Sequence, residues 1–291
     1  MPPLWQRRSA IKFYRILALS WHWLLAGAWK IREKLNLPFT VSVGQGKSIR
    51  LFPVGQIARC LYCESYEADE RTLVARSLKV GMTMIDIGAN IGLYSLIADK
   101  LVGPSGVILS IEPSEETFQR LLNNQRLNNA SRVKPLKTAL GASDDQSMLL
   151  VRETGKLDGE KFVAACQPDI ALEADIENVS VVTLDTLCRR NGITQVDFIK
   201  MDVEGGEYAV LQGARDLLAS NPHLLMVFEH TRPLSERAGH RPDAIPKMLA
   251  EFGFRLYGWD AQAKDWTTSY DFILTHGNAW ATTNPESLPR V

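Results

Sequence analysis

Short apolar runs recur along this chain. Some of them are followed by a glycine turn or an acidic residue, and segments of helical character lie between them. The runs cover residues 84–87, 106–112, 133–140, 198–203 and 224–229. A run with little polar alternation is typical of a strand that is buried on both faces, as the strands of parallel sheets are. Because helical segments separate the runs, the pattern predicts an α/β protein built around a mostly parallel sheet.

The rest of the pattern predicts further elements around that sheet. Residues 40–53 alternate on either side of a turn at 44–46, which predicts a small β-hairpin. A polar, irregular insert at 155–177 is where we expect residues that face a substrate. The other expected elements are helices at 68–78, 206–220 and 242–252, strands at 147–153 and 178–184, and two antiparallel terminal strands at 255–259 and 271–275.

The most informative segment is the turn after the first run. Residues 84–94 give the order of a buried strand, a tight turn and a helix start. Gly88 and Gly92 let the backbone approach a ligand with no β-carbon in the way. Asp86 can accept hydrogen bonds from a positively charged ligand group, so the turn suits a cofactor that carries a cation. A dinucleotide fold requires Gly-x-Gly-x-x-Gly, and here Asn90 replaces its second glycine.

Acidic residues follow two more of these strands. Glu112 lies about twenty residues beyond the glycine turn, where a carboxylate commonly binds both hydroxyls of a ribose, and Pro113 then ends the strand. The alternative is that Glu112 is a solvated strand-end acid. Asp202, Glu204 and Glu207 crowd one strand end, which is unfavourable unless a cation, hydrogen-bond donors or a helix N-terminus offsets their charges. A first-turn helix position explains Glu207 alone.

These residues resemble the FkbM family of S-adenosylmethionine-dependent methyltransferases. The resemblance runs from Tyr66 to His230, and it is specific because several spaced motifs agree in order. Gly206 stands where the family more often carries another small residue, and the region before Pro38 lies outside the resemblance. The motifs are residues 66–67, 85–92, 111–114, 139–141, 183–187, 199–207 and 228–230.

The resemblance implies a class I methyltransferase, a Rossmann-like α/β sandwich. Its sheet would be mostly parallel and seven-stranded, with an antiparallel terminal strand, and its cofactor would be S-adenosyl-L-methionine. The residues that the resemblance implies for cofactor binding are Glu67, Asp86, Gly88, Asn90, Gly92, Glu112, Pro113, Ala139, Leu140 and Asp202.

The resemblance also implies which part of the cofactor each segment would meet. Asp86 and the glycine turn would line its amino-acid end, and Glu112 its ribose. Residues 139–141, at the end of the third strand, would flank the adenine. Asp202 would lie beside the reacting sulfonium. Glu67 would cover the pocket from the preceding helix, with an exposed helix-start acid as the alternative.

The family mostly methylates hydroxyl groups, so the resemblance implies O-methylation of a sugar, a glycolipid or a secondary metabolite. An alcohol must lose its proton during transfer, which favours a base near the methyl group. Glu204 or His230 is the expected base, and Asp202 is expected mainly to orient the cofactor. The alternatives are that His230 is satisfied by backbone and that Glu229 is a structural acid.

Three further readings stay open at the level of the sequence. Asp202 and Glu229 carry oxygen ligands of the kind that Mg²⁺ prefers, but no ligand spacing demands a metal and none is expected. Glu112 after a glycine turn also fits a nicotinamide-dependent oxidoreductase, although Asn90 and the Asp-Val-Glu-Gly strand end count against it. A third reading is a non-catalytic member that binds the cofactor within a membrane-associated complex.

Composition narrows the class of partner. The chain has 291 residues with 33 basic and 33 acidic side chains, so it lacks the basic footprint of a nucleic-acid-binding protein. We therefore expect a small-molecule or glycan acceptor. Of four cysteines, Cys60 and Cys63 form a single CxxC with no second pair to complete a zinc site. Reduced thiols fit a cytoplasmic protein.

The N-terminal segment has a separate character. Residues 5–34 hold four of the seven tryptophans, and their polar side chains fall on one narrow stripe of a helix. Three interpretations compete: a helix packed on its own domain or a partner, a helix lying in a membrane surface, and a signal peptide or anchor. We expect an amphipathic helical segment at 1–37, a hairpin and connector at 38–65, and a methyltransferase domain at 66–291.

Overall fold

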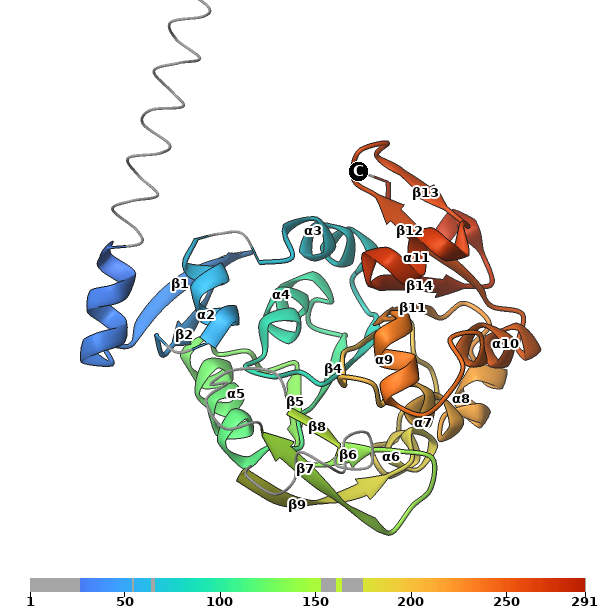
Figure 1. Cartoon of the computed structure of the whole chain (residues 1–291), viewed down its shortest axis with the longest axis horizontal. Helices are drawn as coiled ribbons and strands as arrows, with labels where there is room; N and C mark the ends of the chain where they lie inside the picture. The colour runs from blue at the N-terminus through green and yellow to red at the C-terminus, as the bar shows by residue number, and fades with distance from the viewer. Residues whose placement is uncertain (1–26, 54, 64–65, 153–160, 164–174, 291) are drawn as a thin grey trace, which may run out of the picture. The chain divides into compact units, whose positions relative to one another are not determined.

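The computed structural model describes residues 27–53, 55–63, 66–152, 161–163 and 175–290. By their contacts these residues fall into two compact units (Figure 1). The smaller unit takes the described residues up to 41 and from 50 to 68, and the larger unit takes 42–49 and the described residues from 69 onward. The domain boundaries expected at 37 and 65 remain predictions.

The predicted hairpin is present. It consists of β1 (Phe39–Gly44) and β2 (Lys47–Leu51), which form a two-stranded sheet. Gln45 and Gly46 connect them with φ values of 55° and 72°. Two consecutive left-handed residues are the signature of the tight turn that matches the twist of a hairpin, and they explain the glycine in the turn.

Aromatic side chains form the core of the smaller unit. Residues 27–35 are helical, and α2 spans Gly55–Tyr62. The ring of Trp29 lies 5.9 Å from Phe39 and 5.7 Å from Tyr62, measured between centroids. The guanidinium of Arg32 lies over the Phe39 ring at 5.4 Å. Most of the helix expected at 5–34 falls outside the described residues, and only its last part, residues 27–34, can be compared.

The larger unit is built on one mixed sheet. Within the described residues eight strands form it in the order β13-β12-β14-β11-β10-β3-β4-β5. The five from β11 to β5 are parallel, and β14 runs antiparallel to both β11 and β12. The strands are β3 (Thr83–Ile87), β4 (Val107–Ile111), β5 (Val133–Leu136), β10 (Phe198–Met201), β11 (Leu225–Glu229), β12 (Arg255–Asp260), β13 (Asp265–Thr267) and β14 (Asn278–Thr282).

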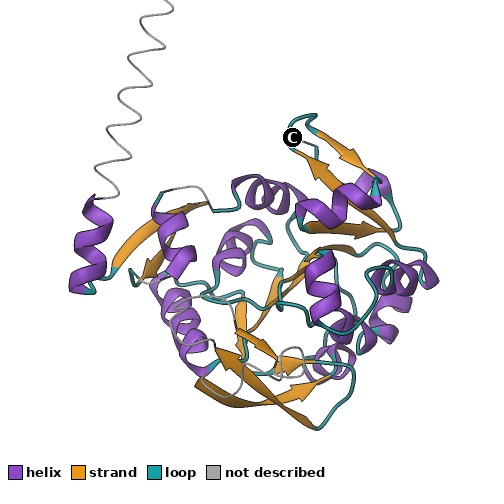
Figure 2. Cartoon of the chain, viewed as in Figure 1, coloured by secondary structure: helices purple, strands orange, loops and turns teal. Residues whose placement is uncertain are grey.

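This arrangement confirms a mostly parallel sheet whose last strand in the chain is antiparallel, but the described residues form eight strands where seven were predicted. Since β12 and β11 are both antiparallel to β14, β12 is parallel to the other five strands. The last strand in the chain, β14, is then the antiparallel member of a seven-stranded sheet, and the three-residue β13 is added at the edge. Helices precede, separate and follow the parallel strands, and Figure 2 draws them in purple. They are α3 (Ala68–Ser77), α4 (Leu93–Leu101), α5 (Glu115–Leu127), α6 (Leu184–Arg190), α7 (Glu207–Gln212), α8 (Arg215–Ser220), α9 (Arg232–Arg237), α10 (Ala244–Glu251) and α11 (Tyr270–His276).

The parallel strands are buried on both faces, as their apolar runs predict. Alternate side chains such as Ile85, Ile87 and Met201 join the main apolar core, which α6, α7, α8 and α10 complete. The intervening side chains face the opposite way. Among them are Asp86 and Lys200, which are polar, so this second face of the sheet is where buried charges occur.

A second sheet lies between β5 and α6 in the sequence. Its strands, in the order β6-β9-β7-β8, are β6 (Ala139–Leu140), β9 (Asp175–Val182), β7 (Gln146–Arg152) and β8 (Lys161–Val163). The strands predicted at 147–153 and 178–184 are therefore present. The single strand predicted over 133–140 is wrong, because the chain leaves the main sheet after Leu136 and Ala139 pairs with β9 instead.

Two other predicted elements need correction. The helix expected over 206–220 is broken into α7 and α8 at Gly213, where a β-carbon would lie 2.1 Å from the carbonyl oxygen of Gly141. The strand expected at 271–275 is instead helix α11, because the Ser269 side chain accepts a hydrogen bond from the Phe272 amide and caps a helix start. No helix among the described residues is long and apolar enough to cross a membrane.

Candidate active site

Four strand ends come together at one edge of the main sheet. Ile87 is in register with Ile111 on one side and with Met201 on the other, and Met201 is in register with Phe228. The next residue along each strand therefore emerges in the same row. These residues are Gly88, Glu112, Asp202 and Glu229, which confirms that the strand-end carboxylates singled out in the sequence share one edge.

The glycine turn is held tightly against its neighbours. The amides of Gly88 and Ala89 both donate to the carbonyl oxygen of Ile111, at 3.0 and 2.9 Å. Gly88, Asn90 and Gly92 all have left-handed backbones, with φ values of 74°, 49° and 93°. Left-handed φ is costly for most residues and nearly free for glycine, and asparagine tolerates it better than most. The turn that replaces the dinucleotide motif is therefore specified by its own residues.

Glu112 has two backbone donors. Its Oε2 accepts from the amide of Asn90 and its Oε1 from the amide of Ser114, both at 3.0 Å. The carboxylate thus ties the glycine turn to the start of α5, and it is buried rather than solvated. A carboxylate at a strand end can also accept hydrogen bonds from ribose hydroxyls. Pro113 lies between these two partners.

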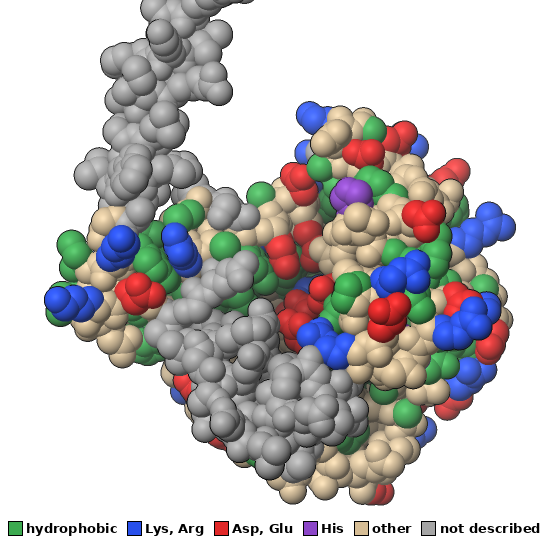
Figure 3. All heavy atoms as spheres, viewed as in Figure 1, with side chains coloured by type: hydrophobic (Ala, Val, Ile, Leu, Met, Phe, Trp, Pro, Cys, Tyr) green, Lys and Arg blue, Asp and Glu red, His purple; other side chains and the backbone are tan. Residues whose placement is uncertain are grey.

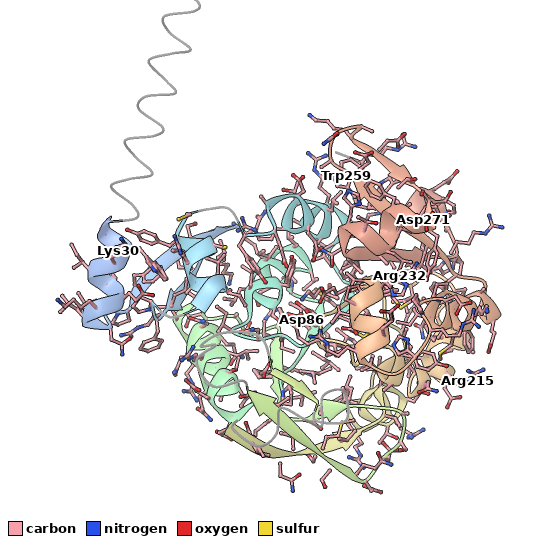
Figure 4. All side chains as sticks on the ribbon, viewed as in Figure 1. Lys30, Asp86, Arg215, Arg232, Trp259 and Asp271 are labelled. Carbon is pink, nitrogen blue, oxygen red and sulfur yellow. The ribbon has the colours of Figure 1, made fainter. Side chains whose placement is uncertain are left out.

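Asp86 lies below the edge, at the centre of the larger unit, as its label in Figure 4 shows. Its side chain is 1% exposed, and Oδ2 accepts from the hydroxyl of Ser95 on α4 at 2.6 Å. Among the described residues its Oδ1 has no hydrogen-bond partner. Burial raises the pKa of the Asp86 carboxyl, and the charge of Lys200 offsets part of that effect. A buried carboxylate oxygen without a donor is rare, and it points to a missing ligand group.

Three carboxylates gather on the other side of the turn. Asp202, Glu204 and Glu229 each offer an oxygen within 4.8 Å of the others. Figure 3 shows acidic side chains near the middle of the larger unit. Burial, and then the charges of Asp202 and Glu207, raise the pKa of Glu229 to about 7. Glu204 adopts a left-handed φ of 52°, which is unusual for glutamate and typical of functional turns.

Glu207 has a structural role in the same turn. It is the first residue of α7, and its Oε1 accepts from the amide of Val203 at 3.0 Å. Burial raises the pKa of Glu207 to about 7. The side chain closes the turn after β10 and is itself inaccessible. The first-turn helix position expected for it is confirmed.

His230 is positioned differently from the three carboxylates. Its side chain is 1% exposed and its Nε2 lies 3.2 Å from the hydroxyl of Tyr270. That hydroxyl donates to the carbonyl oxygen of Pro242 at 2.6 Å, so Nε2 of His230 is the donor in its own contact. Burial, and then the charge of His240, lower the pKa of His230 to about 4. The imidazole is therefore neutral at pH 7 and is a weak base.

The remaining expected cofactor residues lie further out. The side chain of Ala139 packs in the small core of the second sheet, and Leu140 packs in the main core. Any approach of this segment to an adenine would thus use its backbone. Glu67 precedes α3 in the smaller unit, with a left-handed φ of 43°. The cofactor-binding role of these three residues remains a prediction.

Lys200 is the main residue that the sequence reasoning missed. It is buried in β10 and its Nζ lies 2.9 Å from Oδ2 of Asp202. The sequence does carry a signal for it: Lys200 lies within an otherwise apolar strand, and a buried lysine almost always has a charged partner. The nearest acid in that motif, Asp202, follows two residues later.

The fold and this edge define the class of protein: an α/β protein with a ligand site at the ends of parallel strands. The model of the methyltransferase FkbM domain matches residues 86–256, which is more than half of the chain. The chain belongs to the FkbM methyltransferase family. It is a methyltransferase, and its cofactor is S-adenosyl-L-methionine, as expected from the sequence.

Curated relatives carry names that agree with this family. The methyltransferase sdnD of Sordaria araneosa is 29% identical over 198 residues, which is 60% of this chain and 73% of the relative. Methyltransferase 1 of Beauveria bassiana is 29% identical over 146 residues, covering 46% and 58% of the two chains. The hexuronic acid methyltransferase AglP of Haloferax volcanii is 24% identical over 190 residues, covering 64% and 68%.

Among solved structures, the methyltransferase FkbM from Methylobacillus flagellatus is similar with a TM-score of 0.44 and 17% sequence identity. The matched region covers 77% of this chain and 54% of that chain. The family membership decides between the enzyme classes left open by the sequence, in favour of methyl transfer over nicotinamide chemistry.

Proposed function

We propose that the chain methylates a hydroxyl group of a sugar, a glycolipid or a secondary metabolite. The observation that carries the proposal is the meeting of Asp202, Glu204 and Glu229 beside the glycine turn, within 4.8 Å of one another. A carboxylate at that position can take the proton that an alcohol must lose. The hexuronic acid named in one relative is a hydroxyl-rich acceptor of the same class.

The residues at the sheet edge fit S-adenosyl-L-methionine. The unpartnered Oδ1 of Asp86 suits the ammonium of the cofactor's amino-acid end. Gly88 leaves the turn without a side chain, and Glu112, held at the same edge by the amides of Asn90 and Ser114, is the carboxylate proposed to accept from the ribose hydroxyls. When bound, the cofactor supplies the methyl group as an electrophile. We propose that these three residues hold it and that Asp202 orients it from the next strand.

We propose Glu229 and Glu204 as the pair that removes the proton from the acceptor. A general base works best when its pKa lies near the operating pH, and the pKa of Glu229 is about 7. The low pKa of His230 and its contact with Tyr270 give that residue less support for the same role. Positioning of the acceptor in line with the methyl group supplies much of the remaining rate.

The test is a methyl-transfer assay on the purified full-length chain. Tritiated S-adenosylmethionine is incubated with a cell extract, and the labelled product is fractionated into sugars, glycolipids, other small molecules, protein and nucleic acid. We expect label in one of the first three fractions, on oxygen. Label that appears only in protein or nucleic acid would contradict the proposed acceptor class.

The proposed base is tested with Glu229→Gln, which keeps the shape and removes the ionisable group. The variant should lose about a hundredfold or more in kcat and still bind S-adenosylhomocysteine. Glu251→Gln is the matched control, because Glu251 lies on α10 in an exposed pair with Arg215. Normal kcat in Glu229→Gln would remove Glu229 from the mechanism and leave Glu204→Gln as the next variant.

We further propose that the enzyme works in the cytoplasm and contacts a membrane surface through its N-terminal segment. Ile31 and Leu35 are one helical turn apart and are 61% and 59% exposed, whereas Trp29 on the opposite face is buried. Lys30 and Lys34 are exposed next to them. An apolar face beside basic side chains suits the surface of a bilayer that contains anionic lipids.

Co-sedimentation with vesicles tests the membrane proposal. The full chain should pellet with vesicles that contain phosphatidylserine, and the double variant Ile31→Ser, Leu35→Ser should pellet less. Val80→Ser is the control, because Val80 is 73% exposed in the larger unit. Equal sedimentation of all three proteins would rule out this surface as the contact.

A further inference from the structure

Lys200 is a buried cation beneath the candidate site. It is 5% exposed, although burial of a lysine charge is expensive unless the charge is paired. Its Nζ donates to Oδ2 of Asp202 at 2.9 Å and lies 4.8 Å from the centroid of the Tyr94 ring. The ammonium is therefore held between a carboxylate at the strand edge and an aromatic face of α4, and both contacts favour the charged form.

Lys200 also lies beside Asp86. The two residues are in register on the neighbouring parallel strands β10 and β3, so their side chains leave the sheet on the same face. Ser110 of β4 is in register with Asp86 on its other side, and its hydroxyl lies 2.5 Å from the hydroxyl of Ser95. Asp86 thus faces Ser95, Ser110 and Lys200, and the charges that act on it are those of Lys200 and Asp202.

The ring over Lys200 is anchored to two other elements. The hydroxyl of Tyr94 donates to Oε1 of Glu70 on α3 at 3.0 Å. The side-chain amide of Asn278, at the start of β14, donates to the other oxygen of Glu70. This chain of contacts fixes the tyrosine ring, and so the position of the ammonium, from the side of the sheet opposite to the main core.

We propose that Lys200 is a positioning residue for methyl transfer. It fixes the Asp202 carboxylate at the strand edge, and it balances the charge of Asp86, its neighbour in register on β3. The proposal rests on the proposed function, because Asp86 and Asp202 are assigned to the cofactor there. One cation then serves two carboxylates that would face different parts of the same ligand. Without it, the buried Asp86 would stand close to a second acid, Asp202, with no positive charge to offset either one.

A purely structural lysine and a positioning lysine differ in one measurable property. If Lys200 only stabilises the fold, its replacement lowers the melting temperature and leaves the binding of ligand independent of pH. If it balances Asp86, its replacement lets Asp86 take up a proton nearer to neutral pH, because burial is then less opposed. Binding of a ligand that carries an ammonium group should then weaken as the pH falls.

The experiment is calorimetric titration of S-adenosylhomocysteine into the full chain between pH 6 and 8. The wild type should bind with little change over this range. Lys200→Met should bind about tenfold or more weakly at pH 7, the loss expected for a buried charge-assisted contact, and weaker still at pH 6. Lys200→Gln repeats the test with a polar neutral side chain, in case the methionine variant does not fold. Lys247→Met, on the exposed face of α10, is the control.

Each outcome has a distinct meaning. Lys200→Arg keeps the charge, and it should restore a flat pH profile and at least part of the affinity. Neutral variants that bind as the wild type does at every pH would overturn the proposal. If neither neutral variant folds, the affinity of Lys200→Arg decides alone: binding weaker than that of the wild type, with a flat pH profile, supports a positioning role, and wild-type affinity with a lowered melting temperature contradicts it. A wild-type chain that fails to bind S-adenosylhomocysteine would instead refute the proposed function.

Discussion

Gly88 and Asp202 are packed so closely that a side chain on the glycine has no room. A β-carbon at Gly88 would lie 1.8 Å from the backbone carbonyl oxygen of Asp202. The two residues follow adjacent parallel strands, β3 and β10, and each borders the space assigned to the cofactor. The glycine therefore sets the distance between the turn and the neighbouring strand end as well as the shape of the turn itself.

Gly88→Ala is expected to abolish cofactor binding and to destabilise the fold, because backbone atoms on two strands would have to move apart. Gly192→Ala is the matched control. It has a similar left-handed φ, 67° against 74°, but nothing lies within 4 Å of its β-carbon position. The control should cost only the conformational penalty of about 1 kcal/mol. Urea unfolding measures the free energy of unfolding of both variants. An equal loss in the two would show that the fold accommodates a β-carbon at Gly88 at no extra cost.

Glu112→Gln should weaken cofactor binding and lower stability together. The amide offers one acceptor oxygen in place of two, so the amide of either Asn90 or Ser114 loses its partner. A buried donor left unpaired costs about 1–3 kcal/mol. Glu116→Gln, on the same α5 but in an exposed pair with Arg120, should change stability by less than about 1 kcal/mol. An unchanged melting temperature in Glu112→Gln would contradict the role of Glu112 in linking the glycine turn to the start of α5.

Asp86→Ala should lose cofactor binding without a matching loss of stability. The carboxylate is buried with one oxygen unpartnered, and its pKa is raised by that burial, so the folded chain is strained by its charge. Asp86→Asn, which keeps the volume, separates the loss of charge from the loss of packing. Calorimetry with S-adenosylhomocysteine and thermal melting measure the two effects. Retention of normal affinity in both variants would refute the assignment of Asp86.

Glu207 should make the free energy of unfolding depend on pH. Its pKa is raised by burial from 4.5 to about 7, so between these values the folded chain binds more protons than the unfolded chain. The stability that Glu207 confers on the fold, compared with a neutral side chain, therefore falls as the pH rises from about 4.5 to about 7. Glu207→Gln should remove a slope of up to about 1.4 kcal/mol per pH unit. The free energy of unfolding of the two proteins is measured at pH 5, 6, 7 and 8. The same dependence on pH in both would be inconsistent with a buried, protonated Glu207.

Dialysis against EDTA is expected to leave methyl transfer intact. Asp202, Glu204 and Glu229 are close enough to share a divalent cation, but Lys200 already pairs with Asp202. Glu229 also carries a proton in part of the population near pH 7, because its pKa is about 7, which lowers the repulsion. Initial rates before and after dialysis, with Mg²⁺ added back, measure the dependence. Loss of activity that Mg²⁺ restores would assign the three acids to a metal.

The parallel strands and their shared edge could be predicted from the sequence because each strand is an apolar run that ends in glycine or an acid. Parallel strands present equivalent ends at one side, so the meeting of Glu112, Asp202 and Glu229 followed from their order alone. The break of the expected helix at Gly213 could not be predicted in this way. It depends on the approach of the Gly141 carbonyl from a distant segment, and no local pattern carries that information.

Helix α11 was missed for a different reason. Phe272, Ile273 and Leu274 form a short apolar run, and such a run has no period that separates a strand from a buried helix. The deciding signals lie at its ends. Ser269 caps the first turn, and Gly277 follows the last residue with a φ of 95°. Together, these two end signals specify a helix and not a strand.

The second sheet begins and ends at points of the chain that are neighbours in space. β6 has only two residues, Ala139 and Leu140, and they pair in parallel with Val181 and Val182 of β9. The forty residues between them, 141–180, thus leave and rejoin the main body at neighbouring points. A stretch mounted in this way can be lengthened, shortened or exchanged while the strand ends around Gly88 keep their spacing.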